Sequence, residues 1–309
     1  MKAKEVSEEE YRRRFPQPLH VFNSLPFIAL NAAKVDRVRY ILTGDEGRTR
    51  MGLVAGQRDG MLLSPFSAPY GGPDFSRDEK IEKVAESVTA LGDFARAEGL
   101  KLRLTLPPVF HSPSMLTKIS TLLLNRHGVL QYADFNYHYD LSRAADFEKH
   151  LQPNSRRNFH TALRSEFRFE QLGNSDAEIS RAYEIIRINH ESLGHALRMS
   201  RQAVIETAKI LPCDFFMLTL GGLDVAAAQI YHVAPGIVQL INWGDIPECR
   251  HLRPMNFMAW KVIEHYSAAG LSIYDLGPAS EDGVAAAGLC DFKASLGCTL
   301  SMKFSFELH

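Results

Sequence analysis

Three short strand-like segments between residues 214 and 243 constrain the fold of this chain most strongly. They cover residues 214–220, 224–232 and 237–243, and the connections contain Gly221-Gly222 and Ala234-Pro235-Gly236. Tight glycine-containing connections of this kind join antiparallel neighbours, because a parallel crossover needs a dozen or more residues. The stretch therefore predicts an antiparallel meander of three strands.

Helical and strand patterns alternate on both sides of the predicted meander. In the C-terminal half the spacing predicts helices at 153–167, 176–192, 201–211 and 254–269, strands at 168–172, 272–276 and 300–308, and a loop between residues 277 and 289. In the N-terminal half it predicts helices at 7–14, 78–98 and 112–127 and strands at 38–42, 50–55, 61–64, 100–106 and 129–141. We expect an α/β (α+β) protein with mixed, largely antiparallel sheets flanked by helices.

Length and composition indicate a folded chain of two domains. The 309 residues exceed the usual single-domain size, so two domains of about 150 residues are expected. Hydrophobic residues make up 45% and charged residues 23%, which are values typical of globular proteins. We place the domain boundary between residues 145 and 146, which gives domains over 1–145 and 146–309.

Charge, hydropathy and cysteine spacing narrow the class of partner. Lys and Arg number 35 against 36 Asp and Glu, which does not favour a DNA-binding surface. No apolar run reaches the ~18 residues needed to span a bilayer, and residues 1–14 are charged, so we expect a cytoplasmic protein without membrane insertion. The cysteines lack metal-site spacing, which predicts free thiols and no metal site; they are Cys213, Cys249, Cys290 and Cys298.

Several short motifs follow the element order of the C-terminal half. They are Asn-Ser-Arg-Arg-Asn-Phe-His-Thr-Ala at 154–162, Pro254 at a helix start, Asp275-Leu276-Gly277, Asp291-Phe292-Lys293 and Leu296-Gly297, with Ser64-Pro65-Phe66 and Pro69-Tyr70-Gly71-Gly72-Pro73 in the first half. Together they resemble the FemAB-like and BioF2-like group of the GNAT acyltransferase superfamily. The resemblance covers nearly the whole chain. It implies two tandem GNAT-like domains, a degenerate one over 1–145 and an acyltransferase domain over 146–309.

The resemblance implies transfer of an acyl or aminoacyl group to an amine. The donor would be acyl-CoA or aminoacyl-tRNA, the acceptor a small-molecule or nucleotide-linked amine, and no cofactor would be tightly bound. The near-zero net charge does not favour tRNA. CoA-binding relatives carry a glycine-rich turn before the third helix, whereas residues 250–256 contain no glycine and Pro254 lacks an N–H donor. Arg250, Arg253 and Asn256 would then hold the donor, the two arginines by charge.

Lys293 and Asp275 are the residues predicted to carry the chemistry. Lys293 follows Phe292 and precedes a small apolar stretch, so its ammonium would be partly desolvated and able to bind a phosphate or polarise a carbonyl; the alternative is a surface lysine on a short helix. Asp275 at a strand end would accept the amine proton or orient Lys293; alternatively, it caps the following loop. Glu281 and Asp282 are alternative acids.

Other residues are predicted to contact substrate. Arg156 and Arg157 lie on a basic helical face with His160 and Arg164, suited to phosphate groups or else simply solvated. Asn242 and Trp243 end a meander strand that approaches the acyl carbonyl in GNAT-like domains, although Trp243 is also typical of a core aromatic. By resemblance Tyr70 faces substrate, while its Gly-Gly neighbours alone indicate a turn.

Three hypotheses follow. The first is an N-acyltransferase in which the amine attacks the donor directly, because no nucleophile signature is present. The second is an aminoacyl-tRNA-dependent FemAB-type transferase acting on a cell-wall-like precursor. The third is a catalytically silent GNAT-like binding protein.

Overall fold

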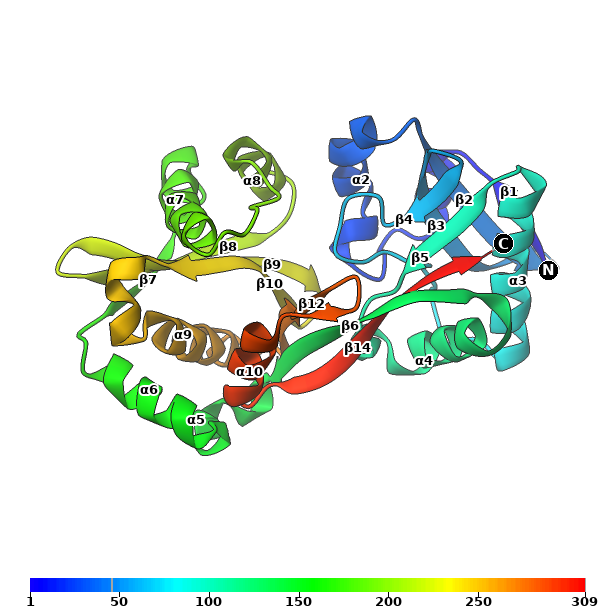
Figure 1. Ribbon diagram of the computed structural model, residues 1–309. Coiled ribbons are helices and arrows are strands. Elements are labelled where there is room, and N and C mark those ends of the chain that lie inside the picture. Colours follow the sequence, from blue (N-terminus) through cyan, green and yellow to red (C-terminus); the bar gives the residue numbers. More distant parts are fainter. Residues whose placement is uncertain (46, 309) are drawn as a thin grey trace. The chain divides into compact units, whose positions relative to one another are not determined.

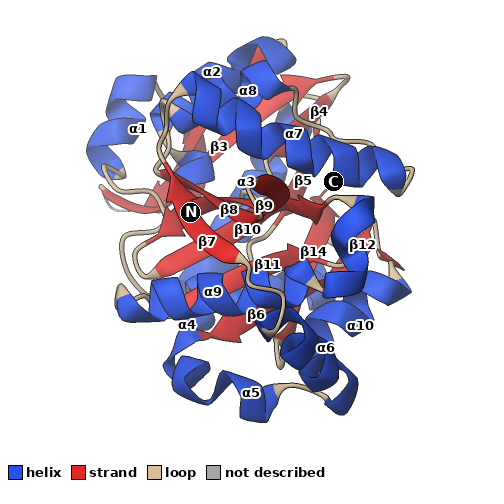
Figure 2. Ribbon diagram, turned by 90° about the vertical axis from the view of Figure 1, so that its left-hand side faces the viewer, coloured by secondary structure: helices blue, strands red, loops and turns tan. Residues whose placement is uncertain are grey.

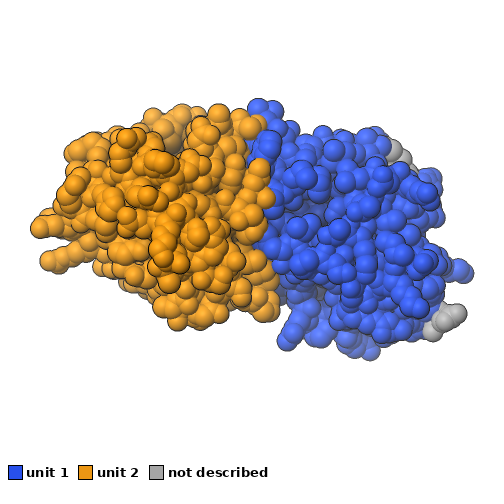
Figure 3. Space-filling view, turned by 90° about the horizontal axis from the view of Figure 1, so that it is seen from below, with its two compact units in different colours: residues 1–135, 280–284, 301–309 blue, residues 136–279, 285–300 orange. Residues whose placement is uncertain are grey.

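The computed structural model describes residues 1–45 and 47–308. By contacts the chain divides into two compact units (Figure 3). Unit 1 comprises Met1–Phe135, Ser280–Val284 and Ser301–His309, and unit 2 comprises Asn136–Ala279 and Ala285–Leu300. The chain therefore passes from one unit to the other four times, and the predicted boundary at residue 145 stays a prediction.

Unit 1 contains a mixed sheet with helices on both faces (Figure 1). Its strands stand in the order β1 (Lys2–Glu5), β2 (Arg37–Asp45), β3 (Arg48–Arg58), β4 (Met61–Ser64), β5 (Lys101–Thr105) and β14 (Thr299–Leu308). Among the strand pairings described in unit 1, only that of β4 with β5 is parallel. The helices are α1 (Glu8–Arg14), α2 (Leu25–Asn31), α3 (Ile81–Ala97) and α4 (Pro113–Leu122).

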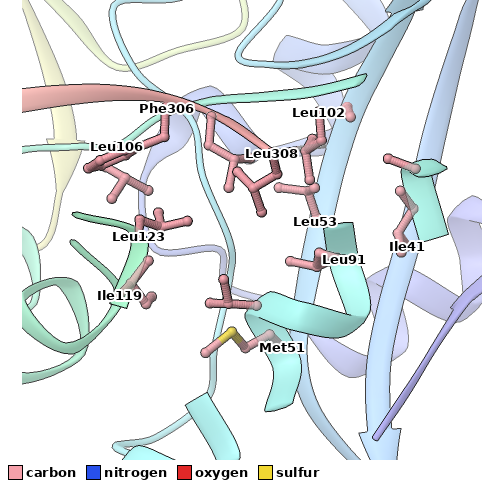
Figure 4. Packing of buried hydrophobic residues seen from close by; sticks show 14 of the residues in the cluster. Ile41, Met51, Leu53, Leu91, Leu102, Leu106, Ile119, Leu123, Phe306 and Leu308 are labelled. Atoms are coloured by element: carbon pink, nitrogen blue, oxygen red, sulfur yellow. The ribbon is translucent and has the colours of Figure 1, made fainter. Parts of the chain in front are cut away.

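Alternation along β2 and β3 builds two cores in unit 1. Ile41 and Leu53 pack with α3 and α4, whereas their neighbours Leu42 and Val54 pack with α1 and α2. Successive strand residues point to opposite faces, so one pair of strands serves both cores. The larger core is completed by Phe306 from β14, near the other end of the sequence (Figure 4).

Unit 2 contains the predicted meander. Its strand order is β6 (Val129–Asp140, of which residues 129–135 belong to unit 1), β11 (Ile273–Pro278), β10 (Ile237–Asp245), β9 (Leu223–Ala234), β8 (Cys213–Leu220) and β7 (Arg168–Leu172). Figure 2 shows α7 (Asp176–Ser192) and α9 (Pro254–Ala268) on opposite faces of β8, β9 and β10. The remaining helices are α5 (Phe147–His150), α6 (Pro153–Leu163), α8 (Arg201–Ala208) and α10 (Ala287–Ser295).

The structure confirms the predicted fold class and most of the elements. The Ser7 hydroxyl accepts from the Glu10 amide at the start of α1, which is half of a capping box. Strand β1 and helix α2 were not predicted, and α6 ends at Leu163 rather than at residue 167. The alternation of apolar and polar residues along the last strand predicts one exposed face. This prediction is wrong beyond residue 302, because Lys303, Ser305 and Glu307 are also buried. Each of these three finds a polar partner in unit 1.

The predicted loop after β11 is a short hairpin. Strands β12 (Ser280–Glu281) and β13 (Val284–Ala285) are joined by Asp282 and Gly283, whose φ angles are 49° and 82°. Two successive residues with positive φ are the requirement of the turn that fits the twist of a two-residue hairpin. The Asp-Gly pair is thus the sequence signal for this element.

Candidate functional site

Two parallel strands part in the middle of unit 2. β10 and β11 pair at Ile237–Ile273, Val238–Tyr274 and Gln239–Asp275, and in the described residues their ladder stops there although both strands continue. β10 stays paired with β9 as far as Asp245. The side of β10 that faces β11 therefore presents backbone groups outside the ladder after residue 240, and these are available to a ligand.

A bulge in each strand accompanies the parting. On β10 the register with β9 shifts between Leu240 and Asn242, and on β11 the register with β6 shifts between Asp275 and Gly277. Gly277 has a φ of 74°, and a Cβ placed on it would lie 3.5 Å from the Leu240 carbonyl oxygen. A bulge bends its strand and redirects the side chains, so both strands turn at the same level of the sheet.

Asp275 is fully buried and holds the bulge on β11. Its carboxylate accepts from Asn136 Nδ2 at 2.8 Å, Gln239 Nε2 at 3.0 Å and the Gly277 amide at 2.9 Å. The contact with Gly277 is the loop-capping arrangement given above as an alternative, while a role as proton acceptor stays a prediction.

Lys293 lies on α10 and is 3% exposed. Its ammonium donates to three consecutive carbonyl oxygens, those of Leu276 at 2.7 Å, Gly277 at 3.0 Å and Pro278 at 2.8 Å. Burial lowers the pKa of Lys293 to about 8, and the neighbouring charge of Asp275 opposes this shift. The three donors of an ammonium group match these three acceptors, so the side chain fixes the backbone immediately after the bulge.

Asn242 and Trp243 lie beside this backbone on β10. The Trp243 ring packs on Phe292 of α10 with ring centroids 5.7 Å apart, in an edge-to-face arrangement. Asn242 Nδ2 donates to Gln229 Oε1 at 2.9 Å. Trp243 is half-buried, so one part of its ring meets α10 and another part faces solvent. Lys293, Asp275 and Trp243 therefore belong to one region of unit 2.

The three residues predicted to bind the donor have different surroundings in the turn before α9 and in its first helical turn. Arg250 Nε donates to Asp245 Oδ1 at 3.0 Å and its Nη2 to Ser192 Oγ at 2.5 Å, so its guanidinium ties β10 to the end of α7. Asn256 is buried and donates to Ser155 Oγ of α6 at 3.0 Å. Arg253 is exposed, has a φ of 62°, and makes no side-chain ion pair with any described residue.

The remaining predicted residues lie away from the parting strands or face other groups. Arg156 donates to the carbonyls of Glu148, Lys149 and Leu151 at the end of α5. Arg157 donates to Asn154 Oδ1 at 3.3 Å. Both arginines are exposed, and their role in phosphate binding stays a prediction.

Tyr70 belongs to unit 1. It is fully buried, and its hydroxyl lies 3.0 Å from His111 Nε2, while its ring packs edge-to-face on His20. In this arrangement its hydroxyl meets a histidine rather than solvent. Its predicted contact with substrate stays a prediction.

Sequence reasoning missed Gln239 and Asn136, which hold the Asp275 carboxylate. Both are 1% exposed and stand in strands among apolar and aromatic neighbours. A buried amide in a strand is costly without a hydrogen-bond partner, so each points to a buried polar group nearby. That signal was available in Val238-Gln239-Leu240 and Phe135-Asn136-Tyr137.

In residues 1–45 and 47–308 no three His, Cys, Asp or Glu side chains are grouped in a way that would hold a metal ion. No helix there has both the length and the apolar composition needed to cross a bilayer.

Comparisons with known proteins bear on this architecture. A family model described as an acetyltransferase (GNAT) domain matches residues 149–293. No curated protein matches the sequence. Among solved structures, FemX is similar over 99% of this chain and 97% of its own, with 13% identity and a TM-score of 0.67.

Two other solved structures are similar at comparable coverage. The C-terminal domain of a putative lysylphosphatidylglycerol synthetase from Agrobacterium fabrum has 12% identity and a TM-score of 0.60 over 98% of this chain and 92% of its own. A tandem GNAT protein from the clavulanic acid biosynthesis pathway has 10% identity and a TM-score of 0.51 over 99% and 97%. At these identities the likeness concerns the fold. Residues 149–293 of this chain thus match the model of an acetyltransferase (GNAT) domain, within a chain that has the fold of FemX and of a tandem GNAT protein.

Proposed function

We propose that unit 2 transfers an acyl group from an activated donor to an amine, at the place where β10 and β11 part. The observation that carries the proposal is the ladder that stops at Gln239 and Asp275 and leaves the later backbone of β10 open on one side. An N–H group of that backbone can donate to the carbonyl oxygen of the donor as negative charge develops there. The parting strands also give the donor a fixed direction relative to the amine.

Direct attack by the amine is preferred over a covalent enzyme intermediate. Burial raises the pKa of Cys213 and of Cys298 to about 12, and it also raises the pKa of Cys249. Thiols with such values stay protonated near neutral pH and are poor nucleophiles. Cys213, Cys249 and Cys298 are therefore not nucleophiles in the proposed reaction.

In the proposed reaction Lys293 is a positioning residue. Its three donors go to backbone carbonyls, so it fixes residues 276–278 rather than binding the donor carbonyl itself. Its buried positive charge also favours negative charge developing nearby. Trp243, packed on the same helix, would form a wall of the acyl pocket.

Two versions of this proposal differ in the donor, which is acyl-CoA in one and aminoacyl-tRNA in the other. Acyl-CoA would use the first turn of α9, where Arg253 offers a cation at a helix start without a side-chain cap. The second candidate is an aminoacyl-tRNA donor, favoured by Pro254, which lacks an N–H, and by the engagement of Arg250 with Asp245 and Ser192. The missing N–H of Pro254 and the existing hydrogen bonds of Arg250 each leave the diphosphate of CoA with fewer hydrogen-bond partners in this turn.

A thermal-shift experiment separates the candidates. A ligand at a hundred times its Kd stabilises the folded state by about 2.7 kcal/mol, which is a clear rise in Tm. A rise with acetyl-CoA that is reduced in R253A, but not in R168A, supports the CoA donor; Arg168 is an exposed arginine on β7. A rise only with a non-hydrolysable aminoacyl-tRNA analogue supports the second candidate. If neither donor raises Tm and no amine is acylated, the transferase proposal fails in favour of a silent binding protein.

A further inference from the structure

The hairpin between β11 and α10 is fastened by a buried ion pair that the reaction proposed above does not use. Lys303 Nζ lies 3.2 Å from Asp134 Oδ2, and the two side chains are 8% and 4% exposed. Lys303 also donates to the Pro69 carbonyl at 3.2 Å. All these residues belong to unit 1, as do hairpin residues 280–284.

The other oxygen of Asp134 holds the first arm and the turn of the hairpin. Asp134 Oδ1 accepts from Ser280 Oγ at 2.8 Å and from the Gly283 amide at 3.0 Å. Ser280 Oγ in turn accepts from the Phe135 amide at 2.8 Å. Because Gly283 is the second turn residue and Ser280 lies on the first arm, a single carboxylate determines where the turn lies.

Apolar burial contributes little to holding this hairpin. Residues 281–289 are exposed, and Val284 is 75% exposed. A segment with few buried apolar contacts opens at low free energy unless polar contacts hold it. The contacts to Asp134 are therefore the main restraint on the turn.

Both ends of the hairpin join residues of the candidate site. At the first end, the Pro278 carbonyl accepts a hydrogen bond from Lys293 Nζ. At the second end, immediately before α10 begins, the Ala286 amide donates to the Ala279 carbonyl at 2.9 Å. The hairpin is thus the covalent connection between the backbone that Lys293 holds and the helix that carries Lys293. A displaced turn would transmit its displacement to both ends.

We propose that Asp134 and Lys303 are positioning residues for acyl transfer, acting through the hairpin on the backbone held by Lys293. This inference rests on the proposed function of unit 2. Burying two charges costs desolvation free energy that an apolar pair of similar volume avoids, so stability alone does not account for the pair. Fixing the position of an exposed turn does account for it.

Two double variants separate position from stability. D134L/K303M removes both charges and the acceptor for the hairpin, whereas D134N/K303M removes both charges and keeps an oxygen for Ser280 and Gly283. We expect both to have a urea midpoint near that of the unaltered protein. In D134L/K303M we expect amides at 280–286 and in α10 to exchange on the order of tenfold faster. We expect D134N/K303M to exchange like the unaltered protein.

Turnover gives the second readout. In D134L/K303M kcat should fall on the order of tenfold with KM for the donor unchanged, because positioning rather than binding is lost. D134N/K303M should retain kcat. The control is E307Q, which removes the two ion pairs that Glu307 of the same strand makes with Lys101 and Arg103; the contacts described for Glu307 include no hairpin residue. It should change neither exchange at 280–286 nor kcat.

The inference is overturned if stable D134L/K303M keeps the hairpin protected, if only the hairpin and not α10 loosens, or if both loosen with kcat unchanged. Should D134L/K303M not fold, S280A removes one hairpin contact and leaves the ion pair, with the same expected direction of exchange. Absence of turnover in the unaltered protein would count against the proposed function alone. The exchange measurements would still support or overturn the hairpin coupling, since they need no substrate.

Discussion

At the scale of single residues, Lys293 fixes the backbone that follows the bulge on β11 through three hydrogen bonds. Its position after Phe292 among small apolar residues predicted a desolvated ammonium, and the side chain is indeed buried. Its partners were not predictable, because they are backbone carbonyls that a bulge at Leu276 and the positive φ of Gly277 bring together. Residue types indicate the chemistry of a side chain. The three backbone carbonyls converge on one point only because the strand bends, and residue types do not indicate that bend.

Replacement of Lys293 tests its positioning role. K293M should lower acyl transfer and destabilise the protein by about 3 kcal/mol, because buried carbonyls lose their donor. The rate should be measured at a temperature where the variant is folded, and R168A is the control. Undiminished turnover in folded K293M would contradict the role.

The pH dependence of Lys293 gives a prediction with opposite signs for rate and stability. Its folded pKa of about 8 is below the ordinary value of 10.5, so between these values the unfolded chain binds more protons. Its contribution to stability therefore rises as pH increases from 8 to 10.5, by up to about 1.4 kcal/mol per unit. Transfer should decline over the same range because the ammonium loses a donor. K293M should lack the stability increment in urea titrations at pH 8 and 10.

Arg253 allows charge to be separated from backbone strain. Its φ of 62° is costly for a residue with a Cβ and natural for glycine. R253G should therefore change stability by less than about 1 kcal/mol, since relief of strain is offset by a freer unfolded chain. If the guanidinium holds the donor, R253G and R253A should lose affinity equally in a donor titration. Retained affinity in both would place the donor elsewhere.

At the scale of elements, the meander and the helices on either side of it followed from spacing, because tight turns and a 3.6-residue period are local properties. The hairpin at 280–285 was predicted as a loop, although Asp282-Gly283 is a hairpin signal; its flanking strands are only two residues long and carry no alternation. The parting of β10 from β11 was not predictable from either strand. It depends on bulges defined by their partners β9 and β6.

The bulge on β11 can be tested at its glycine. G277A puts a side chain at a φ of 74°, which should cost about 1–2 kcal/mol and shift the backbone that Lys293 holds. Transfer should fall with it. G288A in α10 is the control, because no heavy atom lies within 4 Å of the added carbon and alanine favours a helix. Equal stability of the two variants by urea unfolding would rule out strain at Gly277.

At the scale of the whole molecule, composition predicted two compact parts, and the sequence pattern did not reveal how the chain is divided between them. Strand β14 pairs with β5 in unit 1 through Ser305 and Thr105, which are 200 residues apart. Strand partners so far apart in the sequence cannot be identified from the residue pattern of either strand alone. Polar residues buried in β14 further obscured its position inside a sheet.

Unit 1 should lose stability in acid through His20. Burial lowers the pKa of His20 to about 4, and its Nε2–H donates to the Gly71 carbonyl beside Tyr70 and His111. The unfolded chain binds more protons below pH 6.5, so stability falls as pH drops from 6.5 to 4, by about 3 kcal/mol. Burial raises the pKa of Asp74 to about 6, so protonation of this carboxyl makes stability rise as pH drops and partly offsets the effect of His20. The His20 contribution is therefore measured as the difference between a His20 variant and the unaltered protein at each pH.

The comparison uses H20N, which can still donate to Gly71 and does not titrate. Its stability should depend less on pH between 6.5 and 4 than that of the unaltered protein, while exposed His251→Asn should match the unaltered protein. Trp243 and Trp260, the two tryptophans of the chain, both lie in unit 2, so unit 1 is followed by circular dichroism. Parallel pH profiles for H20N and the unaltered protein would refute the assignment.

Completion of the unit 1 core by Phe306 and Leu308 has a consequence for synthesis in the cell. Domains emerging from a ribosome generally fold in order, the N-terminal one first. Here the first hundred residues cannot close their core when they emerge, since two of its apolar side chains are translated some two hundred residues later. The nascent chain must carry unsatisfied apolar surface throughout synthesis of unit 2. Chaperone binding to stalled chains that end before residue 300, and its loss once chains containing residues 300–308 are released from the ribosome, is the result expected from that order of events.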